Sequence, residues 1–157
     1  MRRVRGFTLI ELVITVAISG LLATAAMPLA ELTVKRGREQ ELKVALREIR
    51  TAIDAYKKAA DQGHIELDAE ATGYPPTLEV LVTGVEDAAS LDKRMIYFLR
   101  RLPRDPQFPD GSVPAAETWG VRSYASSPTE PQAGDDVYDV YSLATGKALD
   151  GSSYREW

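Results

Sequence analysis

Hydrophobic positions dominate the first part of the chain. From Phe7 to Ala30 there are 24 residues and a single charged side chain, Glu11. A helix rises about 1.5 Å per residue, so this run extends about 36 Å, which exceeds the roughly 30 Å of a membrane's hydrocarbon core. The pattern predicts a transmembrane helix over residues 7–30. Because a carboxylate costs about 2 kcal/mol or more near the bilayer centre, Glu11 calls for a functional reason.

A different pattern follows in residues 31–62, which are rich in the good helix formers Glu, Lys, Arg, Ala and Leu. Apolar side chains recur there at three- and four-residue spacing and face a charged side, which predicts an amphipathic helix that continues the span. Gly20 with Pro28, and Gly37, are weak points, and Gly63 is the expected end. The apolar stripe comprises Leu42, Ala45, Leu46, Ile49, Ala52, Ile53 and Tyr56.

Residues 63–157 predict a small globular α/β part. Thr77 can cap a short helix over Leu78–Val82. The apolar patch within Leu91–Leu102 fits either a helix or a strand, and of the two we expect a helix. Val121–Ala125 and Val137–Leu143 are rich in Val and Tyr and predict two hairpin strands joined by a long loop. The predicted fold class is α+β: a long N-terminal helix, transmembrane in its first half and amphipathic in its second, packed on a small C-terminal domain with a short helix and antiparallel β-sheet.

Composition narrows the possible chemistry. The 157 residues include no cysteine, which excludes disulfides, thiolate chemistry and Cys-based zinc sites. The formal net charge is −4. Loss of the three arginines before the span would lower it by three, to −7. An acidic soluble part argues against a nucleic-acid partner, which needs clustered Lys and Arg.

The N-terminal residues Arg5-Gly-Phe-Thr-Leu-Ile-Glu-Leu12 resemble the cleavage and methylation motif of type IV pilins and of the pseudopilins of type II secretion. The resemblance implies that a prepilin peptidase removes residues 1–6, cutting between Gly6 and Phe7, and methylates the new amine of Phe7. Glu11 stands where the family has a glutamate five residues into the mature chain, and the resemblance marks it as an assembly residue.

The N-terminal sequence has two alternative interpretations. In an ordinary secretory signal peptide, the three arginines would form the charged region and Ala23-Thr24-Ala25 the cleavage site. The early carboxylate and an apolar run longer than the usual roughly 7–15 residues count against it. A plain single-span anchor is the other alternative.

The back half resembles the major pseudopilin of type II secretion, although 12 residues, Gln107–Thr118, separate Asp-Pro from Trp-Gly here, where the family joins them directly. The motifs are Gly73-Tyr-Pro-Pro-Thr-Leu78, Leu102-Pro-Arg-Asp-Pro106, Trp119-Gly120 and Asp139-Val-Tyr-Ser-Leu143.

The resemblance implies a structural subunit that polymerises into a periplasmic filament and supports protein export across the outer membrane. Its implied partners are further copies of itself, other pseudopilins, an inner-membrane assembly platform and the prepilin peptidase. It implies a bacterial inner-membrane protein with a cytoplasmic N-terminus and a periplasmic C-terminal part; the charge count alone does not favour this orientation. The alternatives are a type IV pilus subunit, whose usual disulfide-bounded loop cannot form here, and a monomeric membrane-anchored periplasmic binding module.

No catalytic constellation is evident, and we do not expect an enzyme. His64 is the only histidine and follows the long helix, where we interpret it as incidental. Asp135, Asp136 and Asp139 are interpreted as solvated turn residues.

Calcium is the one metal that the resemblance implies, in the loop after the Tyr-Ser strand. Ala144 and Thr145 stand where the family has an aspartate. Ser142, Asp150 and Ser152 could rebuild a site with backbone carbonyls. Because fewer charged ligands weaken a calcium site, we expect at most weak binding and assign no certain cofactor.

Overall fold

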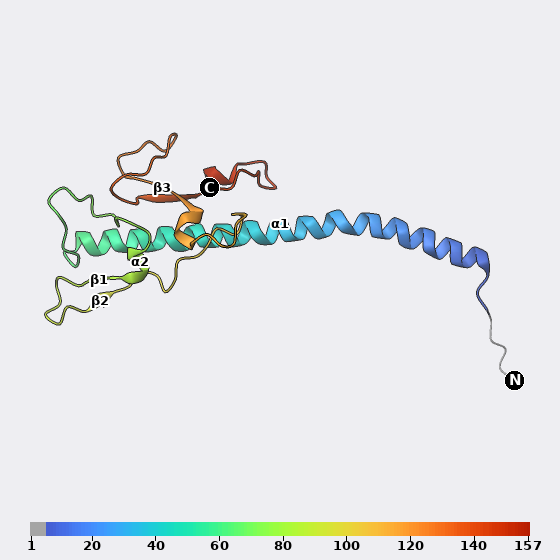
Figure 1. The fold of residues 1–157 in the computed structure, drawn as a ribbon, viewed down its shortest axis with the longest axis horizontal. Helices are drawn as coiled ribbons and strands as arrows, with labels where there is room; N and C mark the ends of the chain where they lie inside the picture. Colours follow the sequence, from blue (N-terminus) through green and yellow to red (C-terminus); the bar gives the residue numbers. More distant parts are fainter. Residues whose placement is uncertain (1–5) are drawn as a thin grey trace. The chain divides into compact units, whose positions relative to one another are not determined.

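The computed structural model of the chain describes residues 6–157; residues 1–5, which include the three arginines, lie outside the described part. The chain divides into two compact units, one that ends at Gly37 and one that comprises Arg38–Trp157. Figure 1 labels the elements along the chain. Each unit is described by itself below.

Helix α1, Leu9–Asp61, runs from the first unit into the second, as the helical pattern predicts. Gly20, Pro28 and Gly37 do not break it. The helix ends where expected, because Gly63 has φ +76°, a left-handed conformation that glycine adopts without a steric penalty. The amides of Gly63 and His64 donate to the carbonyls of Ala60 and Ala59, which satisfies two acceptors of the last turn.

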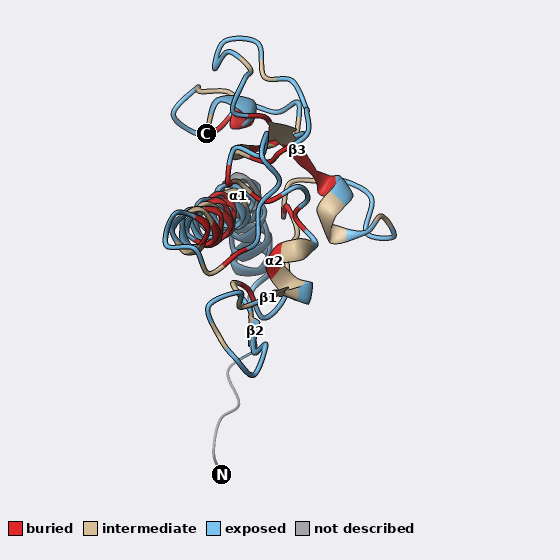
Figure 2. Cartoon of the chain, turned by 90° about the vertical axis from the view of Figure 1, so that its left-hand side faces the viewer, coloured by how far each residue is buried: buried red, intermediate tan, exposed pale blue. Residues whose placement is uncertain are grey.

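The predicted apolar stripe of α1 is the centre of the core of the second unit. Every member of the stripe is buried, and Leu42, Ile49 and Ile53 are 0 to 1% exposed. Figure 2 shows this buried face of α1 turned toward the rest of the unit. The remaining core side chains come from the C-terminal segments, chiefly Leu78, Leu81, Leu99, Trp119, Val137, Val140 and Tyr154.

The first C-terminal elements are helix α2, Val80–Thr83, and the antiparallel strands β1, Val85–Glu86, and β2, Met95–Ile96. The predicted helix over Leu91–Leu102 is therefore wrong. Phe98 and Leu99 both donate their amides to the carbonyl of Leu81, at 3.1 and 2.8 Å, which holds this stretch extended against α2. Exposure alternates there, with Met95 and Tyr97 outward, as in a strand that is buried on one face.

The second pair of strands is the predicted hairpin, with shifted ends. Strand β3, Trp119–Arg122, pairs antiparallel with β4, Asp139–Ser142, and Trp119 lies opposite Ser142. A Cβ on Gly120 would lie 2.2 Å from the ring of Tyr141, so the Trp-Gly motif needs a glycine for packing. In Figure 1, β3 and the β1–β2 hairpin lie on opposite sides of α1.

Two 3₁₀ helices complete the second unit: η1, Ala115–Thr118, and η2, Tyr154–Glu156. The inserted segment Gln107–Thr118 is a loop that ends in η1. The Arg104 guanidinium donates to the carbonyls of Asp110 and Val113 within this loop. The Trp119 indole donates to the Pro103 carbonyl at 2.8 Å, so the strand beyond the insertion is tied to the segment before it.

Candidate processing and assembly site

The predicted cleavage junction lies just before α1. Gly6 and Phe7 are exposed, and Phe7 is 82% exposed. A Cβ built on Gly6 would meet no atom within 4 Å. The fold therefore does not require a glycine at position 6, and a requirement for one would come from a molecule that acts on the junction.

Glu11 forms a reciprocal pair with Thr8 at the start of α1. The Glu11 amide donates to the Thr8 hydroxyl at 3.3 Å, and the Thr8 amide donates to Glu11 Oε2 at 3.5 Å. This is a capping box, which satisfies two of the otherwise unpaired donors of the first turn. The sequence analysis missed it, although Thr-x-x-Glu before an apolar run is its known signature.

The first unit exposes an unusual amount of apolar surface. All described side chains from Gly6 to Thr24 are exposed. By length and composition α1 is able to cross a membrane. Soluble monomers rarely leave contiguous apolar surface of this extent in water, so this surface requires lipid or other helices around it. The large exposed apolar side chains are Phe7, Leu9, Ile10, Leu12, Val13, Ile14, Val16, Ile18, Leu21 and Leu22.

Ser142, the first candidate calcium ligand, is fully buried and has a protein partner. Its hydroxyl donates to Asp105 Oδ2 at 2.6 Å and accepts from the Ala144 amide at 3.1 Å. Asp105 also accepts from the Gln107 amide, and its own amide donates to the Thr118 hydroxyl. These groups form a hydrogen-bonded polar cluster that joins the two ends of the inserted loop to β4.

Asp150, the second candidate, is exposed and forms a local turn. Its Oδ1 accepts from the amide and the hydroxyl of Ser152, at 2.9 and 2.6 Å, and these bonds lower the pKa of Asp150. The side-chain hydrogen bonds of Ser142, to Asp105 and Ala144, and those of Asp150, to Ser152, share no partner. Nor does any group of three or more His, Asp or Glu side chains in residues 6–157 have the arrangement of a metal site.

The C-terminal segment is instead tied to α1 by side chains that the sequence analysis did not single out. Glu39 is buried, and its Oε1 accepts from the Tyr154 hydroxyl and the Leu149 amide, both at 2.9 Å. Burial, followed by the bond to Glu39, raises the pKa of Tyr154 to about 12. Lys43 lies over the Trp157 ring, 4.3 Å from its centroid. The signal for Glu39 was its place three residues before Leu42, on the apolar stripe.

Two of the three carboxylates interpreted as solvated turn residues, Asp136 and Asp139, have partners, which corrects the interpretation for these two; Asp135 is exposed. Asp139 accepts from Arg50 Nε at 2.8 Å and from Arg122 Nη2 at 3.3 Å. Asp136 is buried and accepts from the Tyr124 amide at 2.8 Å and from the Thr72 hydroxyl.

His64 is likewise paired. Its Nδ1 lies 2.8 Å from Asp87 Oδ1, and this bond is the largest cause of the lowered pKa of Asp87. The pair joins the end of α1 to the β1–β2 turn.

Comparison with known proteins agrees with the motif identified at the N-terminus. Residues 1–27 match the model of the prokaryotic N-terminal methylation motif. The chain is 31% identical over 109 residues to the type II secretion system core protein G of Vibrio cholerae serotype O1 (strain ATCC 39315 / El Tor Inaba N16961). The aligned region covers 68% of this chain and 67% of that protein. No solved structure matches the chain. The chain belongs to the family of the type II secretion system core protein G, the G-type pseudopilins.

Proposed function

We propose that this chain is the structural subunit of a type II secretion pseudopilus, a periplasmic filament that supports protein export across the outer membrane. The exposed apolar half of α1, which begins two residues after Phe7, carries the proposal. In the monomer this surface lies in lipid. In the filament it packs against the same surface of neighbouring subunits, so one segment serves first as anchor and then as interface. Growth follows from a head-to-tail contact that does not close.

The proposal divides the chain into four parts. Residues 1–6 are the leader, 7–30 the transmembrane and filament-core helix, 31–62 the amphipathic continuation and 63–157 the periplasmic part. The N-terminus faces the cytoplasm of a bacterial inner membrane. The partners are further copies of the chain, other pseudopilins, an inner-membrane assembly platform and a prepilin peptidase. The chain itself needs no catalytic activity, because the work of assembly comes from other components.

Processing is proposed to occur between Gly6 and Phe7, with methylation of Phe7. Intact mass spectrometry tests this: the mature chain should lack residues 1–6 and carry one added methyl group. Gly6→Leu should leave the precursor uncut, since the motif has a glycine before the cut. The precursor should still be inserted, because a Cβ at position 6 meets no atom of the fold within 4 Å. Gly20→Leu, at another unobstructed glycine, is the matched control and should be cut normally. A mature chain that starts at Ala26 would identify an ordinary signal peptide and contradict the proposal.

Polymerisation needs its own test. Val16→Cys places a thiol on the exposed apolar surface of a chain that has no other cysteine. Crosslinking in membranes that contain the secretion machinery should yield multimers that depend on the machinery. Monomer alone would indicate a single-span anchor or a monomeric binding module.

A further inference from the structure

A groove beside the second half of α1 is left open in the monomer. It has a volume of about 820 Å³ and lies between one face of the helix, around Val44, Arg47 and Thr51, and the segment Phe98–Arg101. Val44 is 53% exposed, although the described apolar side chains of α1 beyond it are mostly buried. The groove therefore combines uncovered apolar surface with a charged border.

The charges at this border are unbalanced. Arg47, Arg100 and Arg101 are all exposed and face a single lining carboxylate, Glu48. None of the ion pairs found within residues 6–157 involves these arginines. A guanidinium binds a carboxylate through two parallel hydrogen bonds, so a border of this kind suits a partner rich in Asp and Glu.

The same chain carries such a segment. No Lys or Arg occurs from residue 59 to residue 92, whereas eight carboxylates do: Asp61, Glu66, Asp68, Glu70, Glu79, Glu86, Asp87 and Asp92.

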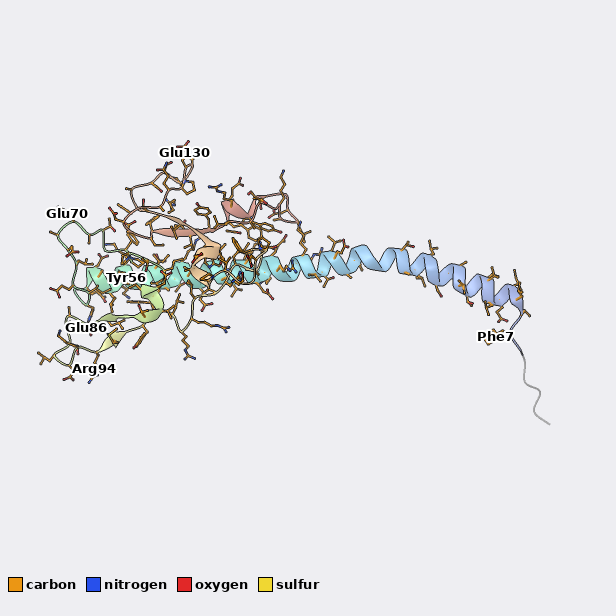
Figure 3. The ribbon with its side chains drawn as sticks, in the orientation of Figure 1. Phe7, Tyr56, Glu70, Glu86, Arg94 and Glu130 are labelled. Carbon is orange, nitrogen blue, oxygen red and sulfur yellow. The ribbon has the colours of Figure 1, made fainter. Side chains whose placement is uncertain are left out.

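Three of these carboxylates, Glu66, Asp68 and Glu70, gather with Asp135 and Asp136 around a separate cavity of about 560 Å³. Glu66, Asp68 and Glu70 are exposed, and none of the ion pairs within the described residues involves them. Figure 3 shows Glu70 and Glu86 near the end of α1 that carries Tyr56, one on each side of the helix in this view.

We propose that the groove of one subunit binds the acidic segment Glu66–Glu70 of a neighbouring subunit in the filament. The inference rests on the proposed function, since it needs a polymer of this chain. The two surfaces share no lining residue, and they lie on different parts of one unit. A contact between two different surfaces of identical subunits propagates rather than closes, as a filament requires.

Helix geometry supports this pairing. Thr51, in the middle of the groove, precedes the end of α1 at Asp61 by ten residues, or about 15 Å of helix. A neighbour displaced by this distance or more toward the N-terminal end of the helix brings its acidic segment level with the groove. Ion pairs at this contact then fix the axial register of neighbouring subunits, in addition to the apolar packing of the first half of α1.

The absence of cysteine allows a direct test. Two differently tagged populations of the full chain are co-expressed with the secretion machinery, one with Thr51→Cys and the other with Ala69→Cys. A short thiol crosslinker should join the two tags, and a link between tags can form only between subunits. Thr145→Cys, at another exposed loop position, replaces Ala69→Cys as the control and should link at least about tenfold less.

Val16→Cys crosslinking in parallel reports assembly. If Val16→Cys forms multimers but Thr51→Cys and Ala69→Cys do not link, or Thr145→Cys links as well as Ala69→Cys, the inference fails and the proposed function stands. If wild-type machinery yields no Val16→Cys multimers, the proposed function fails instead.

Charge reversal provides a second measurement. Arg47→Glu with Arg101→Glu should lower the yield of the link between Thr51→Cys and Ala69→Cys about fivefold or more, since two exposed ion pairs are lost and replaced by repulsion. Adding Glu66→Lys and Glu70→Lys to the partner population should restore it. A misfolded variant would not be rescued by changes in another chain, so failure of the rescue would overturn the inference.

Discussion

The Thr8 hydroxyl accepts a hydrogen bond from the Glu11 amide at 3.3 Å, and Glu11 Oε2 accepts one from the Thr8 amide at 3.5 Å. The carboxylate that we propose to act in assembly therefore also caps the helix that carries it. Cleavage would place a charged amine on Phe7, four residues before Glu11. An amine on a neighbouring subunit is a stronger partner for the carboxylate than the Thr8 amide, because both groups are charged.

We predict that Glu11→Leu is cut and inserted at least as well as the wild type but assembles poorly. Leucine partitions into lipid better than glutamate, whereas the pairing of Glu11 with a neighbour's amine, which would fix axial register, is lost. The measurement is the yield of sheared filaments, or of Val16→Cys multimers, relative to total membrane-held subunit.

Thr8→Ala is the matched control for that variant. It breaks the same capping box and keeps the carboxylate, so assembly should be close to that of the wild type. If Thr8→Ala assembles as poorly as Glu11→Leu, the carboxylate acts through the helix cap. Normal assembly of Glu11→Leu would remove the proposed role altogether.

Calcium should have at most a small effect on the stability of the soluble part from Glu31. The Ser142 hydroxyl is bonded to Asp105, Asp150 is bonded to Ser152, and Glu39 already ties the C-terminal segment to α1. A metal at 100 times its dissociation constant adds about 2.7 kcal/mol, which would raise the melting temperature by roughly 10 °C. Thermal unfolding with calcium and with chelator should differ by far less. A rise of that size, abolished by Asp150→Ala, would contradict the prediction.

Periodic patterns made most of the fold predictable. The first half of the helix from Leu9 to Asp61 follows from the length of its apolar run, and the second half with its buried stripe follows from three- and four-residue spacing. The Leu91–Leu102 stretch was wrongly predicted because a short apolar run has no decisive period. Its extended conformation is set by the pairing of β2 with β1 and by the bonds of Phe98 and Leu99 to the carbonyl of Leu81, partners that the tertiary structure brings close.

Side-chain pairing across the chain was less predictable. Asp139 and its partner Arg50 are 89 residues apart, and Glu39 and Tyr154 are 115 apart. Nothing in the local sequence distinguishes Asp139 from a solvated carboxylate, whereas Glu39 lies three residues before Leu42, on the side of the apolar stripe. The capping box was predictable, since both of its members lie within four residues of each other.

Arg50→Met should destabilise the soluble part by about 2 kcal/mol. The guanidinium donates to Asp139 Oδ1 at 2.8 Å, to the Val140 carbonyl at 3.0 Å and to the Trp157 carbonyl at 2.6 Å. It therefore joins α1, β4 and the C-terminal residue. Partial exposure of the ion pair with Asp139 reduces its contribution, so most of the loss comes from the bonds to the two carbonyls.

Arg50→Lys is the second variant, and it separates the effect of the charge from that of the three hydrogen bonds of Arg50. It keeps the charge but not the planar arrangement of donors, so it should recover less than half of the lost stability. Urea unfolding of both variants measures this. Full recovery of the free energy of unfolding by lysine would show that the charge alone, rather than the three directed bonds, stabilises the contact of α1 with β4 and Trp157.

Tyr154 should make the soluble part sensitive to alkaline pH. Burial, and then the hydrogen bond to Glu39, raises the pKa of Tyr154 from 10.0 to about 12, so the folded state favours the neutral phenol. The stability associated with this shift is complete below about pH 10 and is lost as the pH rises from 10 to 12.

Tyr154→Phe removes the titrating group and leaves Glu39 with only the Leu149 amide, which should cost about 1–3 kcal/mol at neutral pH. The free energy of unfolding of the variant should therefore fall less between pH 10 and 12 than that of the wild type. Tyr97→Phe, which removes an exposed hydroxyl, is the control and should retain the wild-type fall. Equal alkaline losses in the wild type and in Tyr154→Phe would show that the pKa of the phenol is the same in the folded and unfolded states and would contradict the raised pKa.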